Sequence, residues 1–324
     1  MVVRRARCIF SYICTMKHTF ILLLVATLLA VGCSSKSKRE AGRPSAVATN
    51  EFRVPAVPMH ITPENHRDYM VEHYWDAFDF SDTLRLTKLD TLKMLRAYAT
   101  YVGQFVGPQD GASMRRLMRR ADVSRKMMDY FLMLAERVLH DPNSPLRSDE
   151  LYIAVLESQI ASPYYDSYEK LAPEYDLQLA KQNRVGHEAN DIVYTTRDGR
   201  RRRLYGLQGD FVLLYFNNPG CAMCGDVTAA LQRSPIISQA VAEGRLKVLT
   251  LYPDEDIKAW RSHIASLPRE WINGYDHGCA IRRTQSYDLR AIPSLYLLDA
   301  EKRVVLKDCT DVALVEDVLL RRYK

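Results

Sequence analysis

Residues 216–224 read FNNPGCAMC, and the fold of the second half of the chain follows from them. The apolar run at 212–216 that leads into this motif has the length of a strand buried on both faces. A helix is expected from about Ala222 onward. The motif therefore places Cys221 and Cys224 where a buried strand ends and a helix begins. At this spacing on a first helical turn, their sulfurs can form a disulfide.

The position of the cysteine pair at a helix N-terminus predicts its chemistry. Free N–H groups and the positive end of the helix dipole stabilise a thiolate on the first cysteine. Because the thiolate is the nucleophile in disulfide exchange, we expect Cys221 to attack and Cys224 to resolve the mixed disulfide. A Cys-x-x-Cys pair that follows a strand and opens a helix therefore predicts a redox centre.

The sequence around this motif alternates between strands and helices from about residue 184 onward, which predicts an α/β domain. An Asp-Gly turn at 198–199 predicts a hairpin. Ser234 followed by Pro235 predicts the start of a helix, and Gly244 predicts its end. The other expected elements are strands at 246–252, 294–298 and 303–307 and helices at 256–265 and 311–323.

A second motif, LRAIPSL at residues 289–295, lies about 70 residues after the cysteine pair and just before an expected strand. With the two motifs in this order, residues 184–324 resemble the thioredoxin superfamily, in which an Ile-Pro-Thr/Ser-Leu segment carries a cis proline beside the cysteines. This resemblance implies a thioredoxin-like fold and a cis peptide bond before Pro293. It also implies that the backbone of Ile292 pairs with an extended substrate.

The whole chain resembles a group of two-domain bacterial lipoproteins in which an uncharacterised helical domain precedes a thioredoxin-like one. Motifs that recur in that group are HYWD at 73–76, YPDED at 252–256 and WINGYD at 271–276. The resemblance implies the fold class and its boundaries: an all-α domain at 51–183, followed by an α/β thioredoxin-like domain at 184–324.

Several positions depart from the thioredoxin pattern. The buried aspartate of thioredoxin would fall at Tyr215, and the tryptophan before the first cysteine would fall at Gly220. Proton transfer to and from Cys224 therefore lacks its usual carboxylate. Asp254 or Glu255, in the loop after the second core strand, could supply it; the alternative is that this loop is a plain exposed turn. The isoleucine before the proline favours a reductase or an isomerase.

The N-terminus has the pattern of an export signal. Residues 21–31 form an apolar run that basic residues precede. This run is shorter than the roughly 20 residues of a membrane-spanning helix. The sequence LLAVGC at 28–33 resembles a lipobox. We therefore expect a signal peptide at 1–32 and lipidation of Cys33.

The residues after the expected lipid anchor are small and polar, which predicts a flexible tether at 33–50. Met16 is a more typical signal start than Met1. Because no acidic cluster follows Cys33, we expect the protein to face the periplasm, anchored in the outer membrane.

Between 51 and 183 the apolar residues follow a helical period. A capping threonine and a first-turn proline at 62–63 start the pattern, and DPNSP at 141–145 separates two helices. The aromatic residues at 74–80 are expected to pack. The expected core stripes are Leu89, Leu92, Leu95 and Tyr98, and then Met127, Met128, Phe131, Leu134, Ala135 and Val138.

The charge of the chain says little about its partners. Removal of the signal peptide takes away four of the 45 Lys and Arg residues and none of the 39 Asp and Glu residues, which leaves 41 basic residues against 39 acidic ones. Basic runs at 115–120 and 200–203 lack aromatic interleaving, so we expect solvated surfaces and no nucleic-acid partner. We predict no cofactor and no metal site, since His60, His66 and His73 lack a regular ligand spacing.

Cys279 and Cys309 remain once the leader, lipobox and motif cysteines are set aside. In an oxidising compartment they can form a second disulfide, sense the redox state or serve as small buried side chains. A zinc site built from Cys221, Cys224, His277 and Cys279 is an alternative to redox chemistry.

Together these patterns predict a lipid-anchored thiol–disulfide oxidoreductase whose substrates are protein disulfides and which an unidentified membrane partner re-reduces. The alternative, from another class, is an envelope binding lipoprotein that uses the thioredoxin fold as a scaffold with a static disulfide.

Overall fold

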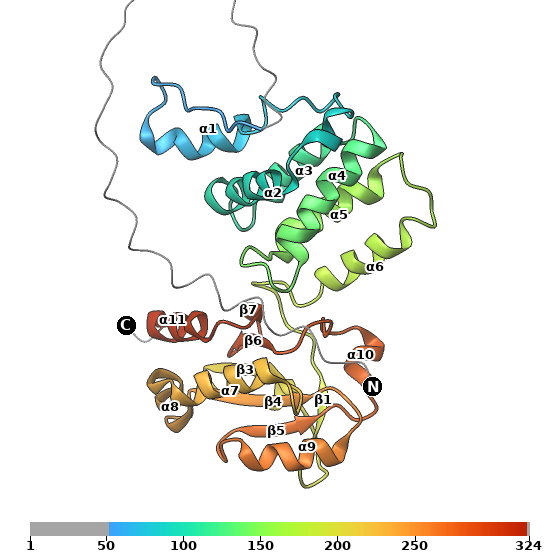
Figure 1. The fold of residues 1–324 in the computed structure, drawn as a ribbon. Coiled ribbons are helices and arrows are strands. Elements are labelled where there is room, and N and C mark those ends of the chain that lie inside the picture. Colours follow the sequence, from blue (N-terminus) through green and yellow to red (C-terminus); the bar gives the residue numbers. More distant parts are fainter. Residues whose placement is uncertain (1–51, 323–324) are drawn as a thin grey trace, which may run out of the picture. The chain divides into compact units, whose positions relative to one another are not determined.

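The computed structural model describes residues 52–322. The expected signal peptide, the lipobox at Cys33 and the tether lie outside the described residues. The described chain begins with a helical part and continues as a sheet with helices (Figure 1), and both parts belong to one compact unit. Within residues 52–322, no helix combines the length and the apolar composition needed to span a bilayer.

The helical part follows the expected periodicity. Four of its helices start at polar caps: the side chains of Asp90, Asp110, Ser124 and Ser148 each accept a hydrogen bond from a first-turn amide. Its elements are η1 (Pro63–Asn65), α1 (His66–His73), η2 (Arg85–Lys88), α2 (Thr91–Thr100), η3 (Tyr101–Phe105), α3 (Gly111–Ala121), α4 (Arg125–Ala135), η4 (Glu136–His140), α5 (Asp149–Ala161) and α6 (Leu171–Ala180).

The core of the helical part is rich in methionine and aromatic side chains. The whole expected stripe on α4 and η4, from Met127 to Val138, is buried. The aromatic residues at 74–80 pack against it: the rings of Trp75 and Phe131 have centroids 5.4 Å apart in an edge-to-face arrangement. The prediction that these aromatic residues pack is confirmed.

The expected stripe on α2 is wrong in part. The side chain of Leu92 is 67% exposed, whereas Met94 is 1% exposed and Tyr98 is fully buried. The helix begins at Thr91 under the Asp90 cap, so positions 94 and 98 face the core at a spacing of four. The helical segment expected after Thr62 is present, because η1 leads directly into α1. The side chain of Thr62 caps no amide, so the expected capping hydrogen bond is wrong.

The described residues of the second part form a seven-stranded sheet with the order β2-β1-β5-β4-β3-β6-β7. Strands β3, β4 and β5 are parallel, and the other neighbouring pairs are antiparallel. The strands are β1 (Val193–Thr196), β2 (Arg201–Arg203), β3 (Phe211–Phe216), β4 (Leu246–Tyr252), β5 (Ile272–Tyr275), β6 (Ser294–Asp299) and β7 (Val304–Cys309). The helices are η5 (Leu204–Gly206), α7 (Ala222–Arg233), α8 (Pro235–Ala242), α9 (Ile257–His263), η6 (Ile264–Ser266), α10 (Ala280–Thr284) and α11 (Val312–Arg322).

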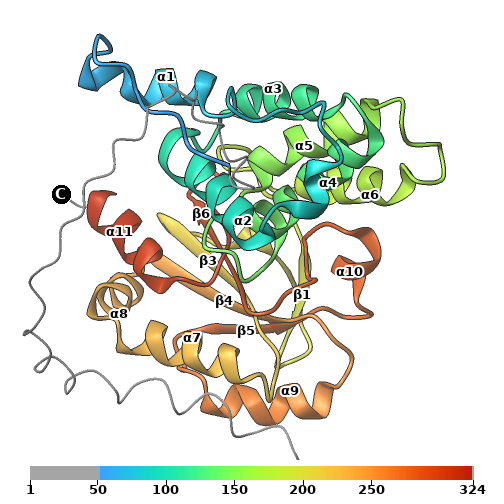
Figure 2. The ribbon, with the colours of Figure 1, turned by 45° about the horizontal axis from the view of Figure 1, so that its top comes forward.

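Strand β3 is an interior strand between β4 and β6, and side chains on both of its faces are buried. Leu213 and Tyr215 belong to one core, which they share with α7, α8, α9 and α11. Val212 and Leu214 belong to a second core on the opposite face. Figure 2 shows α7 and α9 lying along the same side of the sheet. A continuous apolar strand is therefore explained by burial on both faces.

The expected strands, the hairpin and the helix starts of this part are present. Ser234 accepts a hydrogen bond from the amide of Ile237 at 3.1 Å, and Gly199 has the positive φ of 77° that its turn requires. Strand β5 and helix α10 were not expected. Strand β5 joins the hairpin to the parallel strands through pairing with both β1 and β4.

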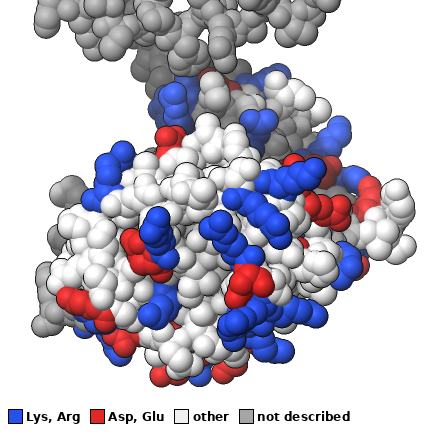
Figure 3. Space-filling view, turned by 90° about the horizontal axis from the view of Figure 1, so that it is seen from below, with Lys and Arg blue, Asp and Glu red and all other residues white. Residues whose placement is uncertain are grey.

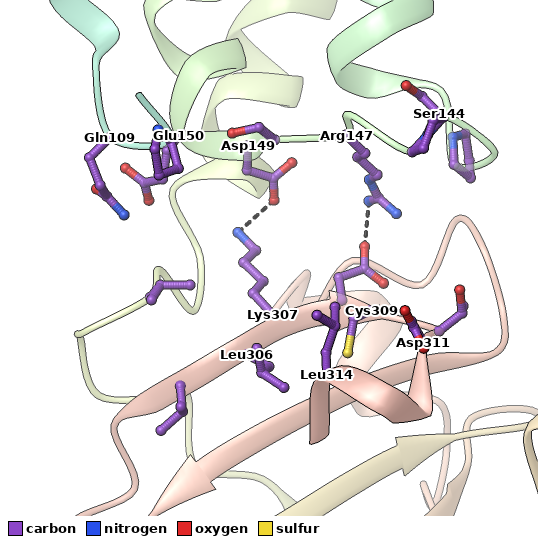
Figure 4. A pocket seen from close by; sticks show the side chains of 18 residues that line it. Gln109, Ser144, Arg147, Asp149, Glu150, Leu306, Lys307, Cys309, Asp311 and Leu314 are labelled. Carbon is purple, nitrogen blue, oxygen red and sulfur yellow. Dashed lines mark ion pairs between the residues drawn. The ribbon is translucent and has the colours of Figure 1, made fainter. Parts of the chain in front are cut away.

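The helical part and the sheet meet at buried ion pairs. Arg147 pairs with Asp308 on β7, and Lys307 pairs with Asp149 at 2.7 Å. The residues of both pairs line a cavity of about 700 Å³ between the two parts. Figure 4 shows Lys307 pointing toward Asp149 there, with the ion pair drawn as a dashed line. Because both side chains of each pair are largely buried, these contacts fix the two parts against each other.

The basic runs noted in the sequence lie at the surface, and several of their side chains pair with acids. Arg120 pairs with Asp76 at 2.8 Å, and Arg203 pairs with Asp191 at 2.7 Å. Figure 3 shows basic and acidic side chains interspersed on the face that it presents. The solvated-surface interpretation of these runs agrees with this pairing.

The corrected packing of α2 gives a stability test. Met94→Ala should lower the free energy of unfolding by about 2–5 kcal/mol, since it empties a buried site. Leu92→Ala on the same helix should change it by less than about 0.5 kcal/mol, since the side chain is solvated. Urea unfolding of both variants measures the difference, and equal losses would contradict the packing described here.

Candidate functional site

Cys221 and Cys224 form a disulfide at the start of α7, with their Cα atoms 5.2 Å apart. The two cysteines differ in access: Cys221 is partly exposed, whereas Cys224 is only 2% exposed. A reagent in solution can therefore reach the first sulfur and not the second. This asymmetry fits an attacking cysteine followed by a resolving one.

Cys221 is the N-cap residue of α7. Its Sγ accepts a hydrogen bond from the amide of Cys224 at 3.2 Å. Gly220, with φ of 77°, makes the left-handed turn that leads into this cap. An amide donor together with the positive helix end stabilises negative charge on the capping sulfur in its reduced form.

The peptide bond between Ile292 and Pro293 is cis, as the resemblance implied. The sulfur of Cys221 lies 3.9 Å from the carbonyl oxygen of Ile292. The sheet brings them together, because Phe216 at the end of β3 is the partner of Ser294 at the start of β6. The segments that follow β3 and precede β6 therefore meet at the same edge.

Tyr215 occupies the position at which thioredoxin has its buried aspartate. Its hydroxyl donates a hydrogen bond to the carbonyl oxygen of Cys224 at 2.7 Å and lies 3.1 Å from the hydroxyl of Thr228. Burial raises the pKa of Tyr215 to about 12. The phenol therefore stays protonated near neutral pH and holds the backbone of the resolving cysteine without exchanging a proton.

The carboxylates of Asp254 and Glu255 contact different residues. The carboxylate of Asp254 accepts a hydrogen bond from the side chain of Asn218, in the cysteine motif, at 3.0 Å, and it pairs with Arg282 at 3.2 Å. Glu255 lies against Cys279, with 3.9 Å between its carboxylate oxygen and the sulfur. Of the two acids, only Asp254 is connected to the motif by a hydrogen bond in the described residues.

Sequence reasoning did not single out Asn218 and Arg282. Asn218 bonds Asp254 through its side-chain nitrogen, while its side-chain oxygen is buried without a partner in the described residues. Its place inside the motif was the available signal. Arg282 could not be found this way, because it reaches Asp254 from α10, a helix that the sequence did not reveal.

The other two described cysteines carry free thiols. Burial raises the pKa of Cys309 to about 12, and burial, with Glu255 beside it, raises the pKa of Cys279. Both therefore stay protonated and weakly nucleophilic near neutral pH. Within residues 52–322, no three His, Cys, Asp or Glu side chains gather to hold a metal ion.

The comparisons with known proteins agree with this architecture. A family model described as a domain of unknown function (DUF5106) matches residues 32–183. A thioredoxin-like protein from Bacteroides caccae, solved as a crystal structure, is 40% identical with a TM-score of 0.79. The match covers 83% of this chain and 98% of that one.

Two further solved structures each match less than half of the chain. The C-terminal domain of an uncharacterized protein from Bacteroides fragilis is 43% identical with a TM-score of 0.42, over 43% of this chain and 98% of that one. A domain of a possible thiol-disulfide isomerase from Cytophaga hutchinsonii is 21% identical with a TM-score of 0.37. This match covers 44% of this chain and 95% of that one.

No curated protein matches the chain. The identity to the Bacteroides caccae protein over nearly its whole length decides the family. The chain belongs to the thioredoxin-like proteins, and in it a DUF5106 domain at residues 32–183 precedes the C-terminal thioredoxin-like domain.

Proposed function

We propose that the protein is a thiol–disulfide oxidoreductase of the bacterial envelope that reduces or isomerises protein disulfides. The observation that supports this most is the position of Cys221. Its sulfur caps α7, remains accessible, and lies 3.9 Å from the backbone edge at Ile292. A nucleophile and a backbone edge for an extended polypeptide are the two parts that disulfide exchange on a protein needs.

The proposed reaction runs in two exchanges. The Cys221 thiolate attacks one sulfur of a substrate disulfide, the substrate S–S bond breaks, and the other substrate sulfur leaves as a thiolate. Cys224 then loses its proton and attacks Cys221, which releases the second substrate thiolate. Two electrons pass to the substrate, and the protein is left with the Cys221–Cys224 disulfide.

Proton transfer from the resolving cysteine needs a base, and we assign this role to Asp254. Tyr215 is unsuited to it because its pKa of about 12 keeps it protonated. Asp254 is linked to the motif through Asn218, while Glu255 faces Cys279. Asp254 therefore takes precedence over Glu255, although both follow the same strand.

The setting of the reaction follows from the N-terminal sequence. The expected signal peptide and lipidation at Cys33 place the protein in the envelope, anchored in the outer membrane and facing the periplasm. Re-reduction of the Cys221–Cys224 disulfide requires a dithiol partner at the membrane, because each turnover removes two electrons from the protein.

Insulin reduction tests the proposed activity. With dithiothreitol as reductant, the chain from residue 34 should reduce insulin, which is seen as turbidity when the reduced insulin precipitates. Cys221→Ser should give only background turbidity, because it lacks the attacking sulfur. Equal background turbidity from both proteins would favour the static-disulfide alternative. A Cys221–Cys224 potential below about −300 mV would point the same way.

The proton-transfer assignment predicts a difference between two neighbouring acids. Asp254→Asn should lower kcat at pH 7 by at least about tenfold, since general acid–base groups contribute this much or more. Glu255→Gln should keep kcat within about twofold. Tyr215→Phe should leave the inflections of the pH–rate profile between pH 6 and 9 in place, because the phenol does not titrate there. A larger loss in Glu255→Gln than in Asp254→Asn would reverse the assignment.

Lipidation can be tested at its single expected site. The full chain expressed in a bacterial host should incorporate labelled palmitate and sediment with the outer membrane, while Cys33→Ala should do neither. Protease treatment of intact cells should leave the full chain uncleaved. Cleavage by protease under these conditions would place the protein on the cell surface and contradict the proposed orientation.

A further inference from the structure

A cavity of about 640 Å³ lies between the helical part and the segment that leads to the cis proline. On the helical side it is lined by side chains from the end of α4 and from η4, among them Met133, Arg137 and His140. On the sheet side it is lined by Arg290 and Ala291. The cavity therefore has one wall in each half of the molecule.

This cavity begins one residue from the site of disulfide exchange. Ala291 lines it, and the carbonyl oxygen of the next residue, Ile292, lies 3.9 Å from the sulfur of Cys221. Neighbouring Cα atoms are about 3.8 Å apart. A polypeptide that pairs with the backbone of Ile292 and continues toward Ala291 consequently enters the cavity within one or two residues of its own cysteine.

The helical part holds the sheet-side wall in place. The guanidinium of Arg290 donates hydrogen bonds to Asp176 at 2.8 Å and to the ring of His140 at 3.0 Å. Its other nitrogens bond Asp288, the nearest contact being 2.7 Å. Asp288 belongs to the same loop and is only 7% exposed. The loop before the cis proline is therefore held on one side by Asp288 and on the other by the helical part.

The charges that line the cavity indicate what it can bind. Arg290 pairs with Asp288 and Asp176, and Arg147, which also lines the cavity, pairs with Asp288 and Asp308. Arg137 and Glu136 on η4 are exposed and form no ion pair or side-chain hydrogen bond in the described residues. A lining with these free charged groups suits a polar polypeptide whose backbone and side chains form hydrogen bonds, and disfavours an apolar ligand.

We propose that this cavity is a binding site for the polypeptide segment that flanks the reactive cysteine of a protein substrate, so that the helical part selects substrates for the thioredoxin-like part. The inference rests on the proposed function. In this proposal, Arg137 is a substrate-binding residue on η4. Arg290 positions the loop that carries Ile292, together with its partners His140 and Asp176.

A trapped complex tests occupation of the cavity directly. The test uses full-length protein in detergent that carries both Cys224→Ser and Cys279→Ser. This protein is reacted with a polar dodecapeptide whose central cysteine bears a thionitrobenzoate leaving group. The Cys221 thiolate attacks the peptide sulfur and thionitrobenzoate leaves. Hydrogen exchange at residues 136–141 should slow at least about threefold in this adduct. It should stay unchanged in an adduct made with the activated cysteine alone, which is too short to reach η4.

The possible outcomes separate the two proposals. Equal exchange at residues 136–141 in both adducts would overturn the cavity assignment and leave the redox proposal intact. If neither reagent forms an adduct that peptide mapping locates at Cys221, the proposed function fails and the cavity assignment fails with it.

Kinetics provide an independent readout. Arg137→Glu in the full chain should raise KM for a protein disulfide by about fivefold or more, because a charge-assisted contact is lost. Its kcat, and its rate of reduction of a small aromatic disulfide, should stay within about twofold of those of the unaltered protein. Arg119→Glu, on an exposed face of α3 outside this cavity, is the matched control. Equal KM values for the two variants would refute a role for Arg137.

Discussion

Burial of β3 on both faces is the constraint on which the site depends. Its six residues are all buried, and it pairs with β4 on one side and with β6 on the other. A shift by one residue would move every side chain to the opposite core, so the register is fixed. That register sets Phe216 opposite Ser294 and thereby brings the cysteine turn beside the cis proline.

The chemistry of the cysteine pair then follows from where the strand ends. The chain turns at Gly220 and starts α7, whose first amides have no helical partner. One of them, the amide of Cys224, donates to the sulfur of Cys221. The partner cysteine is buried and its carbonyl is held by Tyr215. An aspartate at position 215 would place a carboxylate beneath the buried sulfur, whereas the phenol leaves proton exchange to groups outside the core.

Sequence patterns predicted most of the α/β part because its strands are continuously apolar and its helices carry local start and stop residues. They did not reveal β5, since Ile272–Tyr275 contains Asn273 and Gly274 where a strand pattern would have apolar residues. Contact across the sheet explains the glycine: a Cβ at Gly274 would lie 2.7 Å from the ring of Tyr194. Leu92 on α2 was misassigned for a related reason, because a short helix allows two stripes and only packing chooses between them.

The helical part is tied to the site by polar groups that periodicity does not reveal. The hydroxyl of Ser294, next to the cis proline, donates to Asp308 at 2.6 Å, and Asp308 pairs with Arg147 from the helical part. The side chain of Asp308 is 7% exposed, and burial raises the pKa of its carboxyl. Leaving this carboxylate buried without Arg147 would be costly, since an unpaired buried charge destabilises far more than the pair contributes. The helical part thus supplies the counter-charge of Asp308, whose hydrogen-bond partner Ser294 lies two residues from Ile292, where substrate binding is proposed.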